Sequence, residues 1–341
     1  MKRTDVNTLG EFGLIDHLTK DVFPIHTATK RGIGDDAAVI KGADDNVIVV
    51  TTDMLVEGIH FDLIYSPLKH LGYKSMVVNF SDIYAMNAFP RQVLISIAFS
   101  NKYSVEALEE FYEGVQLACR LYGVDLIGGD TTSSPRGMTV SVTAIGEGHQ
   151  DRIVYRDGAK AGDIICVTGN LGAAYLGLQV LEREKQIFLD HPEIQPELDK
   201  HHYLVERQLK PEARKDAVEY FHEKGFKPTA MIDISDGLAS EIFHICKQSG
   251  TGAYIEEAKV PIHPDTEELA LEFKINPITC ALNGGEDYEL LFTIDPSDLE
   301  LVKTMPDIFL IGDILKPGEG ITLHTTGGKI VPLEAQGWKH F

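Results

Sequence analysis

The sequence has 341 residues, of which 43% are hydrophobic and 24% are charged, so it has the composition of a folded globular protein and the length for two domains. It contains 31 Lys and Arg against 52 Asp and Glu, which gives a formal net charge of -21. This charge repels nucleic acid and anionic membranes, and we expect neither as a partner. A polyanionic substrate is repelled too, unless metal ions neutralise its charge.

The N-terminal residues and the cysteines indicate a soluble cytoplasmic protein. The first residues are polar and lack the apolar stretch of a secretory signal, and no apolar run is long enough to span a bilayer. The four cysteines are scattered without a Cys-x-x-Cys pair. This favours free thiols in a reducing compartment over a zinc site or a set of disulfides.

Apolar runs rich in β-branched residues alternate along the chain with segments of helical periodicity. In chain order, the apolar runs predict strands at residues 47–50, 93–99, 138–145, 163–167, 230–234 and 309–314. Apolar residues spaced three and four apart predict helices at residues 73–84, 108–121, 173–184 and 238–247. This alternation indicates an α/β or α+β fold.

A polar, glycine-rich stretch at residues 146–162 lies between two predicted strands and is the best candidate for a domain boundary. We therefore expect two domains, at residues 1–150 and 151–341. A second irregular stretch, at residues 187–200, carries prolines among charged residues and predicts a surface insertion.

Aspartate recurs beside glycine or hydroxyl residues in five short segments, some of them directly after predicted strands. The segments are Gly32-Ile33-Gly34-Asp35-Asp36, Thr51-Thr52-Asp53, Asn79-Phe80-Ser81-Asp82, Gly128-Gly129-Asp130-Thr131-Thr132 and Asp233-Ile234-Ser235-Asp236-Gly237. A single such aspartate is more often a turn former or a helix N-cap. Carboxylates gathered in one place repel one another unless cations neutralise them, and magnesium prefers such oxygen ligands. If the five turns converge, the sequence predicts a magnesium-dependent site for phosphate, and therefore a kinase.

Two other glycine-rich segments match nucleotide-binding motifs only in part. The segment GIGDDA at residues 32–37 has the Rossmann spacing, but no clear strand precedes it and its two carboxylates would face the pyrophosphate. The segment GGK at residues 327–329 resembles the end of a P-loop, but Ile330 stands where Ser or Thr is required. We expect that the first segment is not a Rossmann dinucleotide site and that the second is not a P-loop but a hairpin turn.

Seven motifs follow one another along nearly the whole chain, in the order GIGDDAA, TTDMLVEGIHF, VNFSDIYAMNAFP, LIGGDTT, VTGNLGAA, IDISDGL and GGEDYEL. In order and spacing they resemble the thiamine-monophosphate kinases, a family in the superfamily of aminoimidazole ribonucleotide synthetase, selenophosphate synthetase and the hydrogenase maturation protein HypE. The resemblance implies an N-terminal α/β domain whose sheet pairs with its twin in a homodimer, followed by a C-terminal α/β domain of ferredoxin-like character. ATP would lie between the domains.

The resemblance also implies roles for individual residues. Several magnesium ions would be held by Asp36, Thr51, Thr52, Asp53, Asp82, Asp130, Asp233 and Asp236. ATP, the co-substrate, would contact Tyr122, Gly129, Asp130, Arg156 and Ser235. Thiamine monophosphate would contact His60, Glu286 and Trp338. Among these positions, we expect catalytic roles for Asp53, Asp130 and Asp236.

In the implied reaction, the γ-phosphoryl group of ATP moves directly onto the phosphate of thiamine monophosphate and gives thiamine diphosphate. The acceptor phosphate has a second pKa of about 6 and is largely a dianion at neutral pH, so no general base is needed. Two alternatives stay open. One is another ATP-dependent member of the superfamily, such as aminoimidazole ribonucleotide synthetase, and the other is a non-catalytic protein that binds nucleotide or metal.

The sequence departs from the family pattern at two places. Where many relatives have Met-Gly-Ala, this chain has Met86-Asn87-Ala88, which puts a backbone conformation that glycine favours in doubt. The stretch at residues 187–200 has no counterpart among the catalytic motifs, and we assign it no part in the site.

Overall fold

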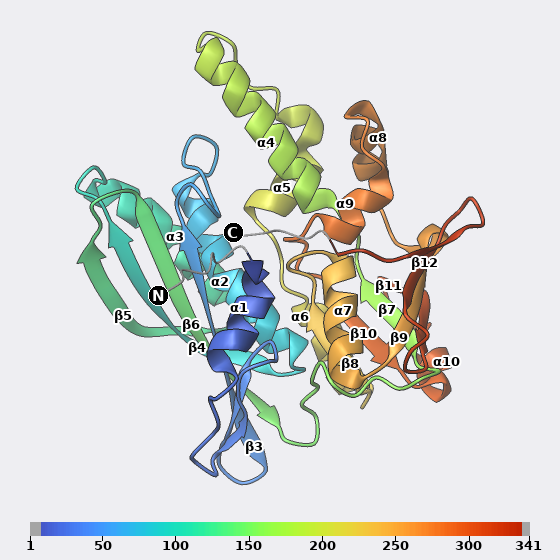
Figure 1. The fold of residues 1–341 in the computed structure, drawn as a ribbon. Helices are drawn as coiled ribbons and strands as arrows, with labels where there is room; N and C mark the ends of the chain where they lie inside the picture. Colours follow the sequence, from blue (N-terminus) through green and yellow to red (C-terminus); the bar gives the residue numbers. More distant parts are fainter. Residues whose placement is uncertain (1–7, 336–341) are drawn as a thin grey trace.

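The structure is a computed structural model that describes residues 8–335, which form two β-sheets with helices around them (Figure 1). The first sheet has six strands in the order β1-β2-β3-β6-β4-β5. These strands are β1 (Thr29–Arg31), β2 (Ala38–Lys41), β3 (Asn46–Val56), β4 (Phe89–Phe99), β5 (Asp125–Ser133) and β6 (Met138–His149). Neighbouring strands are antiparallel except β4 and β5, which run parallel because the crossover helix α3 (Val105–Tyr122) connects them. Helix α1 (Gly10–Thr19) precedes this sheet.

The second sheet has seven strands in the order β13-β12-β9-β11-β7-β10-β8, antiparallel except for the pair β9 and β12. Its strands are β7 (Ile164–Thr168), β8 (Ala230–Asp233), β9 (Gly252–Glu256), β10 (Leu290–Ile294), β11 (Ile308–Leu315), β12 (Ile321–His324) and β13 (Ile330–Pro332). Helices of this half are α6 (Lys215–Glu223), α7 (Leu238–Ser249), α10 (Leu299–Val302), η2 (Asp199–His201), η3 (Glu257–Lys259) and η4 (Pro296–Asp298).

Four further helices project from the second sheet as a separate group (Figure 1). They are α4 (Ala173–Asp190), α5 (His202–Leu209), α8 (Pro264–Glu272) and α9 (Pro277–Asn283). A small hydrophobic cluster of their own, which includes Leu176, Leu204 and Leu269, holds them together. Among the described residues, no helix has both the length and the apolar character that crossing a bilayer requires.

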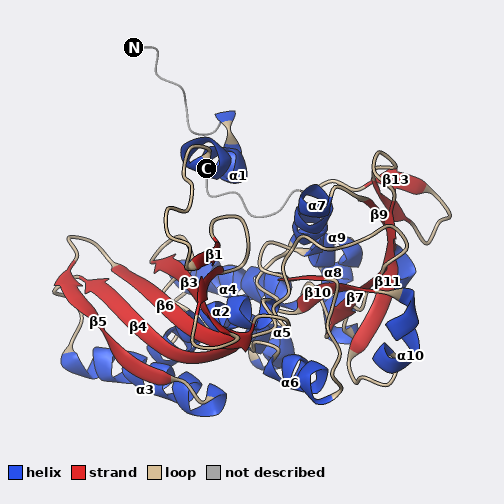
Figure 2. Cartoon of the chain, turned by 90° about the horizontal axis from the view of Figure 1, so that it is seen from below, coloured by secondary structure: helices blue, strands red, loops and turns tan. Residues whose placement is uncertain are grey.

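Helix α2 (Leu68–Ala85) lies at the junction of the two halves (Figure 2). It packs against β3, β4 and β6 of the first sheet and against β8 of the second. Its Val77 and Phe80 belong to the same hydrophobic cluster as Phe221 of α6 and Phe292 of β10, so one core runs through both halves. Burial of this apolar surface fixes α2 in place, and with it the polar side chains that α2 carries into the junction.

All the predicted strands and helices occur, and the predicted mixed α/β class is confirmed. Several elements extend beyond their predicted bounds. The strand predicted at residues 47–50 continues to Val56. The helix predicted to end at residue 184 continues to Asp190, because no Gly or Pro lies between residue 184 and Pro192. Strand β6 continues to His149 and takes in the start of the predicted boundary stretch. The division between residues 150 and 151 stays a prediction, whereas the hairpin predicted at residues 327–329 is confirmed by the pairing of β12 with β13.

Candidate functional site

Three of the predicted aspartates meet at the junction of the two halves. Asp36 lies just before β2, Asp82 lies on α2 and Asp233 ends β8. Carboxylate oxygens of the three residues all lie within 4.8 Å of one another. These three residues, called the acidic cluster below, therefore come from three distant motifs and are brought together by the packing of α2 between the sheets.

Neighbouring side chains hold each carboxylate of the acidic cluster. The hydroxyl of Thr51 donates to Asp82 Oδ2 at 2.5 Å. The hydroxyl of Ser81 donates to Asp233 Oδ2 at 2.6 Å, and Arg156 Nη2 donates to Asp36 Oδ1 at 2.6 Å. The second oxygen of Asp36 is buried and has no hydrogen-bond partner in the described structure. A buried carboxylate oxygen without a partner is costly, so this atom is a candidate ligand for a cation or a hydrogen-bond donor.

Burial and mutual repulsion raise the pKa values of these carboxyl groups. Burial raises the pKa of Asp82 well above its usual range, and the charges of Asp53, Asp233 and Asp36 raise it further. Burial, followed by the charge of Asp36, raises the pKa of Asp233 to about 7. Burial raises the pKa of Asp53 to about 6. Hard oxygen ligands that cannot all ionise without a cation fit magnesium well.

Strand β3 presents Thr51 and Asp53 on one face and Thr52 on the other, because successive strand residues alternate. Thr51 is buried against Asp82, and the backbone N–H of Asp53 donates to Asn79 Oδ1 at 3.1 Å. The exposed Thr52 donates its hydroxyl to the carbonyl of Val142 at 2.9 Å. The Thr52 hydroxyl is therefore bonded away from the acidic cluster, although it was predicted to be a ligand.

The turn of Ser235 and Asp236 joins β8 to α7 and is held by a residue that sequence reasoning missed. Glu241 Oε1 accepts the backbone N–H of Asp236 at 2.9 Å. Glu241 is buried, and burial, followed by the charge of Asp236, raises its pKa well above the usual range. Glu241 lies in the first turn of α7, where carboxylates commonly accept hydrogen bonds from preceding backbone N–H groups. This position in the sequence could have indicated its role.

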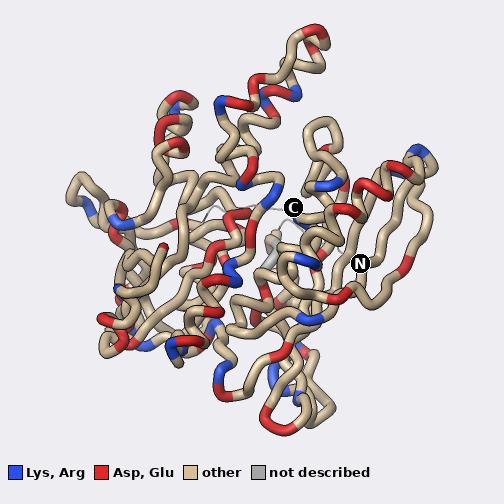
Figure 3. The backbone as a smooth tube through the Cα atoms, turned by 180° about the vertical axis from the view of Figure 1, so that it is seen from behind, with Lys and Arg blue, Asp and Glu red and all other residues tan. Residues whose placement is uncertain are grey.

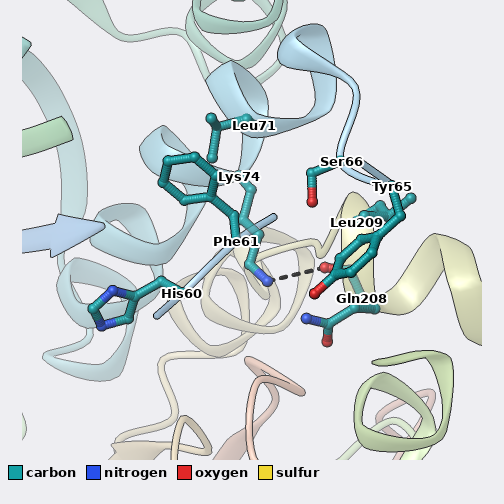
Figure 4. Close-up of a pocket in the computed structure, with 8 residues that line it drawn as sticks. All are labelled: His60, Phe61, Tyr65, Ser66, Leu71, Lys74, Gln208 and Leu209. Atoms are coloured by element: carbon teal, nitrogen blue, oxygen red, sulfur yellow. Dashed lines mark hydrogen bonds between the residues drawn. The ribbon is translucent and has the colours of Figure 1, made fainter. Parts of the chain in front are cut away.

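His60, one of the residues predicted to bind the acceptor, lines a small pocket (Figure 4). His60 Nδ1 accepts the backbone N–H of Val56 at 3.0 Å, which places the proton of the neutral ring on Nε2. Glu286 follows two glycines and has a φ of 57°, in the left-handed region that non-glycine residues rarely adopt. Its carboxylate forms an ion pair with Lys74 and accepts a hydrogen bond from Gln208, two residues that were not predicted to belong to the site.

Known proteins are similar to this chain in sequence and in fold. Residues 34–147 match the family of the AIR synthase related protein, N-terminal domain, and residues 160–307 match the corresponding C-terminal domain. The thiamine-monophosphate kinase of Aquifex aeolicus is 37% identical over 334 residues, 98% of this chain and 98% of the relative. That of Bacillus subtilis is 34% identical over 339 residues, 98% of this chain and 100% of the relative. The chain belongs to the thiamine-monophosphate kinase family.

A solved structure, AaThiL complexed with AMPPCP and TMP, has the same fold, with a TM-score of 0.84 and 34% identity over 100% of both chains. The seven motifs had predicted the thiamine-monophosphate kinase family, and this prediction is confirmed. The predicted two-domain fold of the aminoimidazole ribonucleotide synthetase superfamily is confirmed too. Figure 3 shows that the acidic residues of this family member are spread over the whole chain. The acidic cluster is thus distinguished by burial and proximity, not by charge alone.

The other residues selected by resemblance to the thiamine-monophosphate kinases lie apart from the acidic cluster or outside the description. Gly129 and Asp130 are exposed on the edge strand β5, where Asp130 is in register with Ser96 of β4. Tyr122 packs its ring on Phe80, and its hydroxyl accepts the backbone N–H of Ala213 at 2.9 Å. Trp338 lies outside the described residues. The roles predicted for these four positions stay predictions.

Proposed function

We propose that this chain transfers the γ-phosphoryl group of ATP to the phosphate of thiamine monophosphate, with thiamine diphosphate and ADP as products. The observation that carries the proposal is the acidic cluster, in which the buried Asp36 and Asp233 and the half-buried Asp82 come together from both halves of the chain, with an oxygen of Asp36 that has no partner among the described residues. Family membership supports the reaction, and the relative complexed with AMPPCP and TMP supports ATP and thiamine monophosphate as the substrates.

We propose that magnesium ions bind at the acidic cluster, with Asp53 and the hydroxyl of Thr51 beside it. Asp130, Asp236 and the backbone of Thr52 are proposed as further magnesium ligands outside the acidic cluster. When bound, magnesium would neutralise phosphate charge that the acidic chain otherwise repels. The protein keeps the carboxylates in place before substrate arrives, through the hydroxyl groups of Thr51 and Ser81. Such preorganisation favours reaction because the groups need not reorganise when charge moves.

For ATP, we propose contacts with Tyr122, Gly129, Arg156 and Ser235. Arg156 is the best supported, because its Nη2 is bonded to Asp36 whereas its buried Nε has no partner among the described residues. A guanidinium with a free N–H can still donate to a phosphate oxygen. Its ion pair with Asp36 would hold it next to the metal site.

For the acceptor, we propose contacts with His60, Glu286 and Trp338. The ring of His60 is oriented by the backbone N–H of Val56, which its Nδ1 accepts at 3.0 Å. The acceptor phosphate has a second pKa of about 6 and is already mostly a dianion at neutral pH. The chain therefore needs to position this nucleophile and reduce its repulsion from ATP, and it needs no general base.

We propose that two copies pair through the first sheet and that the protein works in the cytoplasm. The edge strand β5 is exposed along its whole length, including Leu126 and Ile127, which leaves an apolar strand edge open to a partner. Sedimentation should give a dimer, and Ile127→Lys should shift it toward the monomer.

The cysteines are free thiols, which agrees with a reducing compartment.

The activity is tested by mixing the purified protein with ATP, magnesium chloride and thiamine monophosphate. We expect ADP and thiamine diphosphate in equal amounts, measured by chromatography, and no ADP when thiamine monophosphate is omitted. A chelator should stop the reaction, and excess magnesium should restore it. ADP release that does not depend on thiamine monophosphate, or no release at all, would contradict the proposal.

A further inference from the structure

Lys74 is a buried lysine in the middle of α2, with a side chain that is only 6% exposed. Its ammonium lies 2.8 Å from Glu286 Oε1 and donates to the backbone carbonyl of Gln208 at 3.0 Å. Figure 4 shows the ammonium directed into the pocket, between His60 and Gln208. Burying a lysine is costly unless its charge is paired. The ion pair with Glu286 offsets part of the desolvation cost of burying Lys74.

The other oxygen of the Glu286 carboxylate is held from a second helix. Gln208 of α5 donates its Nε2 to Glu286 Oε2 at 2.6 Å. The backbone N–H of Glu286 donates to the carbonyl of Ser235 at 2.7 Å, which fixes the left-handed residue over the turn that carries Asp236. A strained backbone conformation persists only where the surrounding contacts stabilise it. Here the contacts hold both the backbone of Glu286 and the two oxygens of its carboxylate.

Lys74 also relates this carboxylate to the acidic cluster. Lys74 and Ser81 are seven residues apart on α2 and therefore lie on the same face, about 10 Å apart along the axis. Ser81 bonds Asp233 at one end, and Lys74 bonds Glu286 at the other. Helix α2 thus sets the distance between the acidic cluster and Glu286. Thiamine monophosphate carries its phosphate at one end and its rings at the other, so a site that binds both ends requires a fixed distance between them.

We propose that Lys74 is a positioning residue of the acceptor site, which acts by fixing the carboxylate of Glu286 at a set distance from the acidic cluster. The inference rests on the proposed function, in which Glu286 contacts thiamine monophosphate. Lys74 itself need not touch the acceptor. Its removal should therefore affect the acceptor through Glu286 alone and leave the nucleotide unaffected.

The test compares Lys74→Met with Lys69→Met in steady-state kinetics with both substrates varied. Lys69 lies on the same helix but forms an exposed pair with Glu113 at 3.0 Å, so it is a matched control. For Lys74→Met we expect the KM for thiamine monophosphate to rise on the order of tenfold, with the KM for ATP unchanged, because a charge-assisted bond to Glu286 is lost. Lys69→Met should leave both constants unchanged.

A double-mutant cycle asks whether Lys74 acts through Glu286. In a Glu286→Gln background, Lys74→Met should raise the KM for thiamine monophosphate less than about twofold further, because the carboxylate that it positions is gone. Additive effects would overturn the inference. So would an unchanged acceptor KM in Lys74→Met, or an equal rise in both KM values.

Gln208→Met keeps the inference testable if Lys74→Met does not fold. It removes the second bond to Glu286, and because Gln208 Oε1 has no partner in the described structure, it breaks no other side-chain bond. The same selective rise in acceptor KM is expected, and its absence overturns the positioning of Glu286. A wild-type protein without activity toward thiamine monophosphate would instead contradict the proposed function, so the two failures are distinguishable.

Discussion

The hydroxyl of Ser81 on α2 donates a 2.6 Å hydrogen bond to the carboxylate of Asp233 at the end of β8. Ser81 belongs to the first half of the chain and Asp233 to the second, so the bond crosses the junction inside the acidic cluster. Arg156 and Asp36 form another such link at 2.6 Å. The site is complete only when the two halves are packed together, because no single sheet carries all of its carboxylates.

Asp233→Asn should abolish turnover and stabilise the metal-free protein. Asparagine keeps an oxygen that can accept from Ser81 but removes one charge from the acidic cluster, where like charges repel. We expect turnover to fall at least about a hundredfold and the melting temperature in a chelator to rise by about 2 °C or more. Scanning fluorimetry with and without magnesium checks this, with the exposed Asp151→Asn as a control. A variant that keeps its turnover would remove Asp233 from the metal site.

The stability gained by Asp233→Asn should depend on pH. Burial, followed by the charge of Asp36, raises the folded-state pKa of Asp233 to about 7, above the usual value of about 4. The group therefore contributes stability that is fully present below pH 4 and is lost as the pH rises through 7. In metal-free buffer, the advantage of the variant over wild type should grow by roughly 1–3 kcal/mol between pH 5 and pH 8. Urea unfolding at both pH values measures it, and a constant difference would contradict the raised pKa.

The sequence predicted the family and part of the fold, with strands that correspond to β3, β4, β6, β7, β8 and β11, whereas β5 and several other elements were not predicted. The roles of the site residues stay predictions. Motif order selected Asp36, Asp82 and Asp233, although the sequence treated all three as turn residues and the structure places Asp82 inside α2 and Asp233 at the end of β8. Thr52 was selected together with Thr51, although the two-residue period of a strand puts their side chains on opposite faces. The alternation was available in the sequence, but which face would be buried depended on the packing of α2.

Lys74 and Gln208 were missed for a different physical reason. A lysine or glutamine on a helix is ordinarily on the solvent side, and nothing local to either residue indicates burial. Their partner, Glu286, lies more than 75 residues away along the chain in both cases. Long-range pairing of this kind is fixed by the docking of the two halves, which periodicity and local motifs do not describe.

Gly129→Ala should disrupt β5, whereas Gly128→Ala should be tolerated. Gly129 has a φ of 156°, and a Cβ there would lie 1.7 Å from the carbonyl oxygen of Ile95 on β4. A Cβ on Gly128 would lie 3.9 Å from its nearest neighbour, a methyl of Leu94. We expect Gly129→Ala to lose roughly 2–4 kcal/mol of stability and Gly128→Ala less than about 1 kcal/mol. Chemical unfolding and hydrogen exchange in β5 check this, and equal effects would contradict the close approach.

Asn87 adopts a left-handed backbone conformation, and this gives a graded prediction. Its φ is 55°, in the left-handed region that asparagine tolerates better than other side chains, and its Nδ2 donates to the carbonyl of Arg152 at 2.8 Å. Asn87→Gly loses only the hydrogen bond and should cost about 1 kcal/mol or less. Asn87→Ala loses the bond and adds left-handed strain, and should cost about 2–3 kcal/mol. Urea unfolding of both variants measures the order, and an alanine variant as stable as the glycine variant would show that the strain at this turn is absent.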